Sequence, residues 1–155
     1  MKRNKNLLLA VLCAALSLTV MLLVLAGAKP KPGEFTPPPF DTAAVAGSPA
    51  VPDDLGYSQL DCQVYQVSIC GKPNASGDVY LTNPETNDVW LKLRVLDEKG
   101  RILGETGLIR PGEYVKTVDL TKVPKAGTPV VLKIMAYEPD TYHSAGAASL
   151  NTVFS

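Results

Sequence analysis

The chain has 155 residues, in which 15 Lys+Arg balance 15 Asp+Glu, and it contains 13 prolines and 12 glycines. This length allows one ordinary domain with appendages. Because nucleic-acid binding needs clustered Lys and Arg to neutralise phosphates, a net charge of zero excludes nucleic acid as an expected partner.

An uncharged apolar segment near the N-terminus predicts one membrane-spanning helix. Residues 7–28 carry no charged side chain, and a helix of this length spans roughly 30 Å of hydrocarbon. Three cations precede it within residues 1–6, so the positive-inside rule places this tail in the cytoplasm and the remainder of the chain outside the cell membrane. A cleavable signal peptide is the alternative, because Ala26 and Ala28 form an A-x-A site, but its apolar region is usually shorter. We expect a retained single-pass anchor in the lipid bilayer.

A proline-rich stretch follows and predicts a linker. Residues 29–56 contain seven prolines and no periodic apolar pattern. In extended polyproline II at about 3.1 Å per residue, this stretch reaches roughly 85 Å. We expect it to hold the next domain away from the membrane.

Residues 57–155 predict an all-β domain. Short runs of alternating polarity are separated by turn residues, and no apolar stripe recurs at helical spacing. The predicted strands are residues 63–69, 78–82, 89–96, 101–106, 113–120, 130–137 and 147–154. Seven strands in about 100 residues match an immunoglobulin-like or fibronectin-like β-sandwich.

Side-chain parity in two of these strands predicts a contact surface. In residues 89–96 and 130–137, one alternate set is apolar and should face the core, while the other set mixes cations with aromatic residues. Third and sixth strands are neighbours in such sandwiches, so the two outer sets should form one surface. The predicted partner-contact residues are Trp90, Lys92, Arg94, Lys133, Met135 and Tyr137. The alternative is a lone domain in which cations stack on neighbouring rings and the linker covers the tryptophan.

Two cysteines fall in the predicted exported domain. An oxidising compartment permits a disulfide between Cys62 and Cys70. A single extended strand over residues 62–70 would separate their Cα atoms by roughly 26 Å, so a bridge requires a bend or hairpin between them. A disulfide and two free thiols both remain open from the sequence.

The sequence contains no recognisable catalytic or cofactor motif. His143 is the single histidine, and no Gly-x-Ser-x-Gly elbow, phosphate loop or dinucleotide fingerprint is present. Oxygen-rich loops at 83–88 and 138–140 could hold Ca²⁺, but turn-forming side chains explain them better. Asn74 opens an N-x-S sequence and is interpreted as a turn residue. We therefore predict no enzyme activity, no cofactor and no metal site.

Three segments carry a resemblance to a group of proteins: NPETNDVWLKLRVLD, GETGLIRPGEYV and KIMAYEPDTYHSAG. Together they cover much of residues 83–146 and resemble small membrane-anchored surface proteins of Gram-positive bacteria with a C-terminal immunoglobulin-like domain. The resemblance implies the same layout of anchor, spacer and β domain at the cell surface. It supplies no catalytic residues.

These observations predict a non-enzymatic, membrane-anchored β-sandwich that serves as a protein-interaction or accessory module at the cell surface. The alternative is a module that binds a small ligand or envelope carbohydrate, with the exposed rings stacking on sugar.

Overall fold

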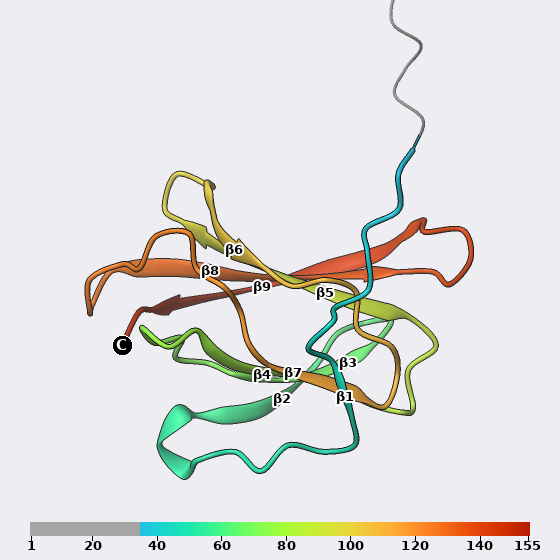
Figure 1. The fold of residues 1–155 in the computed structure, drawn as a ribbon, viewed down its shortest axis with the longest axis horizontal. Coiled ribbons are helices and arrows are strands. Elements are labelled where there is room, and N and C mark those ends of the chain that lie inside the picture. The colour runs from blue at the N-terminus through green and yellow to red at the C-terminus, as the bar shows by residue number, and fades with distance from the viewer. Residues whose placement is uncertain (1–34) are drawn as a thin grey trace, which may run out of the picture. The chain divides into compact units, whose positions relative to one another are not determined.

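Nine antiparallel strands form two sheets that face each other across a hydrophobic core (Figure 1). The computed structural model describes residues 35–155. The strands are β1 (Val45–Ala46), β2 (Tyr57–Asp61), β3 (Gln66–Cys70), β4 (Asp78–Asn83), β5 (Trp90–Asp97), β6 (Ile102–Glu105), β7 (Glu113–Thr117), β8 (Pro129–Tyr137) and β9 (Ser144–Val153). One sheet has the order β1-β7-β4-β3-β2 and the other β6-β5-β8-β9. The all-β prediction is confirmed.

The predicted tail at 1–6, the membrane helix at 7–28 and the first residues of the predicted linker lie outside the described residues. Within residues 35–155, no helix combines the length and apolar character needed to cross a membrane.

The central pair of strands, β5 and β8, follows the parity that the sequence predicts. Their register runs without a break from Trp90 opposite Tyr137 to Asp97 opposite Val130. The inward side chains of both strands are buried because they meet the inner face of the other sheet. They are Leu91, Leu93, Val95, Val130, Leu132, Ile134 and Ala136, and Val89, directly before β5, is buried with them. Each large one contributes about 1.5–3 kcal/mol by leaving water.

All seven predicted strands are present, with shifted ends. The first is shorter than predicted because residues 62–65 form the turn of a hairpin in which Asp61 pairs with Gln66. The fifth predicted strand, residues 113–120, corresponds to β7 and ends at Thr117. The chain leaves its sheet there, and Leu120 forms a bridge to Gly104 of the other sheet. β1 and β2 are not predicted, because both are short, largely exposed strands without the alternating pattern.

Part of the predicted linker belongs to the sandwich, which corrects the expected domain boundary at residue 57. The compact unit runs from Pro37 to Ser155. Phe40 pairs in parallel with Leu108, and β1 pairs with the start of β7. Figure 1 shows this segment passing from the β5 end of one sheet to β1 at the edge of the other. We call residues 37–46 the N-terminal strap.

Gly107 makes the close approach of the strap sterically feasible. A Cβ atom on Gly107 would lie 2.4 Å from the backbone nitrogen of Asp41 and 2.8 Å from the carbonyl carbon of Phe40. The backbone here has no positive φ, so the glycine is needed for space and not for conformation. The Gly107 amide also donates to the Asp41 carboxylate at 2.7 Å. Any side chain at position 107 would push the strap away.

We predict that Gly107→Ala destabilises the protein by about 1–3 kcal/mol, because the added methyl group collides with strap backbone that cannot rotate away. Urea unfolding followed by the fluorescence of Trp90, the single tryptophan, measures the change. Gly71→Ala is the matched control: its Cβ meets ordinary contacts at 3.6 Å and should cost less than about 0.5 kcal/mol. Equal effects of the two substitutions would contradict the role of Gly107.

Candidate functional site

The outer face of the β6-β5-β8-β9 sheet brings the predicted contact residues together. Trp90 lies opposite Tyr137, Lys92 opposite Met135 and Arg94 opposite Lys133. The predicted adjacency of these two strands is therefore confirmed.

The face is less open than the sequence suggests. Lys92 is 6% exposed and Met135 8% exposed, while the other four predicted residues are half-buried. Lys92 is covered because its ammonium group turns toward β6 and pairs with Glu105 at 3.1 Å. Met135 accepts a hydrogen bond on its sulfur from the Tyr137 hydroxyl at 3.7 Å. Lys92 and Met135 were predicted to be exposed contact residues. The structure corrects this: both are buried.

Glu105 joins two cations into one ion cluster on this face. Its carboxylate accepts a hydrogen bond from Arg94 Nε at 2.8 Å and pairs with the buried Lys92. Partial burial acts to raise the pKa of Glu105, but the hydrogen bonds and positive charges of Arg94 and Lys92 outweigh it and lower the pKa below its ordinary value. The cluster is therefore charged at neutral pH and fixes the β5–β6 edge.

Aromatic rings gather around Trp90 at the opposite end of the face. Phe40 of the strap packs edge-on against Trp90 at a centroid distance of 4.8 Å. Tyr142, from the loop between β8 and β9, lies 5.1 Å from Trp90 on centroids. Arg110 stacks over the Phe40 ring at 3.6 Å. We call Phe40, Trp90, Tyr137 and Tyr142 the aromatic corner; it holds four of the chain's ten aromatic residues.

An unusual backbone conformation presents Tyr142 to this corner. Asp140 and Tyr142 both adopt left-handed φ values, +64° and +58°, which non-glycine residues rarely do. The Tyr142 amide donates to the Glu138 carbonyl, and the Glu138 amide donates to the His143 carbonyl, so the loop closes on itself. Strained backbone of this kind persists where surrounding contacts hold it, as the Trp90 contact does here.

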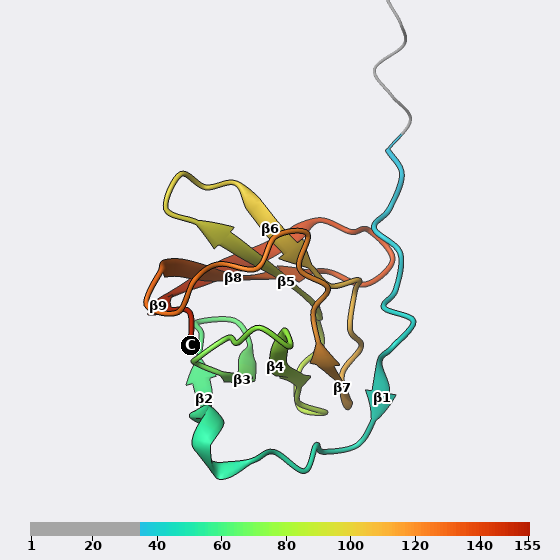
Figure 2. The same cartoon turned by 60° about the vertical axis from the view of Figure 1, so that its left-hand side comes forward.

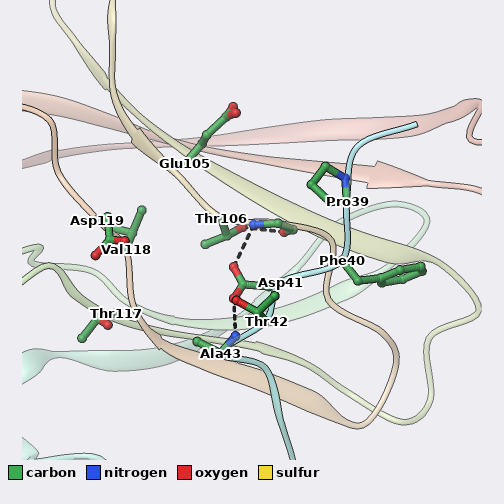
Figure 3. A pocket seen from close by; sticks show the side chains of 11 residues that line it. Pro39, Phe40, Asp41, Thr42, Ala43, Glu105, Thr106, Thr117, Val118 and Asp119 are labelled. Carbon is green, nitrogen blue, oxygen red and sulfur yellow. Dashed lines mark hydrogen bonds between the residues drawn. The ribbon is translucent and has the colours of Figure 1, made fainter. Parts of the chain in front are cut away.

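A hollow of about 330 Å³ lies beside the strap, between the Glu105–Gly107 and Thr117–Asp119 segments (Figure 3). The Asp41 carboxylate points into this region, but it already accepts hydrogen bonds from the amides of Gly107 and Ala43. Figure 3 shows the Glu105 carboxylate turned away from Asp41. The Asp41 carboxylate is thus engaged in holding the strap, and the Glu105 carboxylate in the ion cluster on the sheet face.

The two cysteines of the domain are free, which corrects the candidate disulfide. In the β2–β3 hairpin, Cys70 lies opposite Tyr57 at the open end, whereas the Cys62 amide donates to Tyr65 at the turn. Five strand residues separate these ends, roughly 16 Å, beyond the 4.4–6.8 Å that a disulfide spans. Burial raises the pKa of the Cys70 thiol to about 11, with nearby Asp78 and Asp54 adding to the effect.

The oxygen-rich loops stabilise turns. Asn83 is fully buried and donates to the carbonyls of Val89 and Ile109, while its own side-chain oxygen accepts from Asn87. Asn74 accepts from the amides of Ser76 and Asp78, as its turn interpretation predicts.

His143 is largely exposed, and its Nδ1 lies 3.9 Å from a Glu138 oxygen. Across residues 35–155, no three His, Cys, Asp or Glu side chains come close enough to hold a metal ion.

Sequence reasoning missed Phe40 and Tyr142, the two residues that flank Trp90. Neither lies in a strand, so the period-two pattern carries no information about them. The available signal is local: Phe40 is the aromatic residue that ends the run PPPF, and Tyr142 sits in the turn sequence PDTYH. The alternative that the linker covers Trp90 anticipates the Phe40 contact.

No family model, curated protein or solved structure matches this chain.

Replacing Glu105 by Gln should lower the unfolding free energy at pH 7 by about 1 kcal/mol, discounted for partial solvent exposure. Because the folded-state pKa of Glu105 is lowered, its stabilisation is present above the unfolded pKa and is lost as pH falls through the folded pKa. The difference between wild type and variant should therefore shrink below about pH 4.5.

Urea unfolding at a series of pH values measures this effect. Glu113→Gln is the control: the amide oxygen can still accept the hydrogen bond from the Arg110 backbone at 2.9 Å, and only the 3.6 Å pair with the exposed Arg110 guanidinium is lost, which should cost less than about 0.5 kcal/mol. A pH-independent cost of Glu105→Gln would contradict the charge-based explanation.

Proposed function

We propose that this protein is a non-enzymatic, membrane-anchored module that contacts another protein at the outer cell surface through the aromatic corner. The observation that carries the proposal is the gathering of Phe40, Trp90, Tyr137 and Tyr142 at one end of an outer sheet face. Tyrosine and tryptophan dominate binding energy at protein interfaces, where each offers a large, stiff surface with a polar group.

The strand order supports an immunoglobulin-like or fibronectin-like assignment of the sandwich. The β9-β8-β5-β6 sheet corresponds to the G-F-C-C′ order of such domains, and β3-β4-β7 corresponds to A-B-E. β1 and β2 are then additions at the two edges of the second sheet. Domains of this type commonly present one sheet face or one end to a partner, which fits the position of the aromatic corner.

Position at the membrane follows from the apolar segment at 7–28 and the cations before it. Since the compact unit begins at Pro37, the spacer between anchor and domain is residues 29–36. Eight extended residues reach about 25 Å. We propose an integral membrane protein, or its short external loops, as the partner.

Recognition of envelope carbohydrate is the second candidate function. The pairing of Trp90 with Tyr142 favours it, because adjacent rings of this kind stack on sugar faces. The edge contact with Phe40 and the contact with Tyr142 already occupy part of the Trp90 ring, which leaves less open surface than a sugar platform uses. We therefore favour the protein partner.

Cross-linking on intact cells tests the proposal. The full chain, Tyr142→Ala and Tyr57→Ala are expressed at equal levels and treated with a membrane-impermeant amine cross-linker. We expect one defined heterologous product with wild type and a loss of at least about tenfold with Tyr142→Ala, because an interface tyrosine contributes about 2 kcal/mol. Tyr57, an exposed tyrosine on β2 of the other sheet, is the matched control and should leave the product unchanged.

Each other outcome contradicts a part of the proposal. A product that forms only after cell lysis opposes the extracellular location. Equal loss with both tyrosine variants opposes the aromatic corner as the contact. Binding of the purified full chain to isolated envelope glycan, abolished by Tyr142→Ala, would replace the protein partner with the carbohydrate.

A further inference from the structure

We infer that strand β9 pairs edge to edge with β9 of a second copy of this chain, so that two four-stranded sheets join into one. β9 lies at the free edge of the β6-β5-β8-β9 sheet and, with ten residues, is the longest strand of the described part (Figure 2). Its sequence, SAGAASLNTV, contains no charge and no proline. Natural sheet edges are normally blocked by such features, so an edge without them is suited to pairing.

The other three edges of the sandwich are short or covered. β1 has two residues and β2 has five, ending in Asp61. The outer side of β6 is bridged by Leu120 at Gly104, and the Thr121 amide donates to Leu103. Among the described strands, β9 therefore offers the one long edge free of charge.

The hydrogen-bond pattern shows which backbone groups of β9 face outward. Phe154 exchanges hydrogen bonds with Gly127 and Thr128 on the β8 side, whereas the Ser155 amide donates to Pro73 on the opposite side. Because the direction alternates along an antiparallel strand, the odd-numbered residues Ala147, Ser149 and Asn151 direct their amides and carbonyls away from β8. Residues 145–151 make no backbone-to-backbone hydrogen bond outside the β8 ladder with any described segment.

Parity and two-fold symmetry allow a register centred on Ser149, which we choose because it sets Ala148 against the partner's Leu150 beside the open core edge. In a symmetric antiparallel pair the two-fold axis passes through one residue of each strand, and an axis at Ser149 matches the outward backbone groups of Ala147, Ser149 and Asn151 with one another. This register places Ala147 opposite Asn151 of the partner and makes about six backbone hydrogen bonds. On the inner side it places Ala148 opposite the partner's Leu150, a small residue against a large one. No like charges meet.

The core is incompletely covered on this side of the sandwich, which favours a second copy as the occupant. Ala148 and Leu150 pack against the core but remain half-buried, as does Leu60 on β2. A hollow of about 340 Å³ lies between the β2–β3 turn and residues Gly146–Ala148 of β9. In the proposed register the partner's Leu150 comes next to Ala148 at this hollow, so each copy supplies the apolar side chain that the other lacks. This inference does not depend on the aromatic corner.

Cysteine cross-linking of the full chain in lipid vesicles tests the register. Cys13 and Cys62 are replaced by Ala, and the buried Cys70 is retained. We expect Ser149→Cys to form a disulfide-linked dimer under mild oxidation, because directly opposed residues of a hydrogen-bonded pair have Cα atoms about 5.5 Å apart. Asn151→Cys is the matched control, since the same register holds its two copies about 13 Å apart.

A dimer yield at least about tenfold higher at position 149 than at 151 supports the inference. Equal yields at the two positions, or no dimer at position 149, would overturn it.

A second measurement guards against local distortion by the new cysteine. Ser149→Lys places two like charges at the two-fold axis, so the dimer population of the otherwise unaltered chain, measured by sedimentation in detergent, should fall. Ser58→Lys adds the same charge to exposed β2 and should leave the dimer intact. A wild-type chain that stays monomeric as its concentration rises, or a dimer insensitive to Ser149→Lys, would contradict strand pairing.

Discussion

The unbroken pairing of β5 with β8 is the constraint on which the rest of the structure depends. Eight consecutive residue pairs fix which side chains face the core and which face outward. A slip of β5 by one residue would turn Lys92 and Arg94 toward the core and expose Leu91 and Leu93. The same register that fills the core therefore places Trp90 beside Tyr137 and Lys92 beside Met135. The core and the candidate site therefore lie on opposite faces of the β5–β8 pair.

The N-terminal strap adds an aromatic side chain to the outer face of the β5–β8 pair. It passes over Gly107 at a distance that only a residue without a side chain allows, and it brings Phe40 against Trp90. At the other end of the face, the Glu105 carboxylate pairs with both Lys92 and Arg94, so the buried Lys92 ammonium group has a partner of opposite charge. The two surfaces that we propose for contact lie on this sheet: the aromatic corner, through side chains, and the β9 edge, through backbone groups.

The sequence predicted the strands whose side chains alternate between polar and apolar, and it missed the features that leave no such pattern. Strands buried on one face, such as β5 and β8, carry a clear pattern, and their pairing followed from it. The strap carries no such pattern, because its docking rests on backbone contact with Gly107, and composition alone therefore suggested a linker. The exposure of Lys92 was overestimated for a related reason: its partner Glu105 lies on a neighbouring strand, and parity does not report cross-strand ion pairs. The ring contact of Tyr142 depends on two left-handed residues that no propensity predicts.

Residue-resolved hydrogen exchange of the full chain tests the central role of the β5–β8 ladder most directly. Leu91 and Leu93 direct their amides away from β8, to Ile109 and to the Thr106 hydroxyl, so alternation points the amides of Lys92 and Arg94 into the ladder. These amides should exchange only through global unfolding and be the slowest in the domain. Exchange as fast as that of the edge strand β2 would contradict the account.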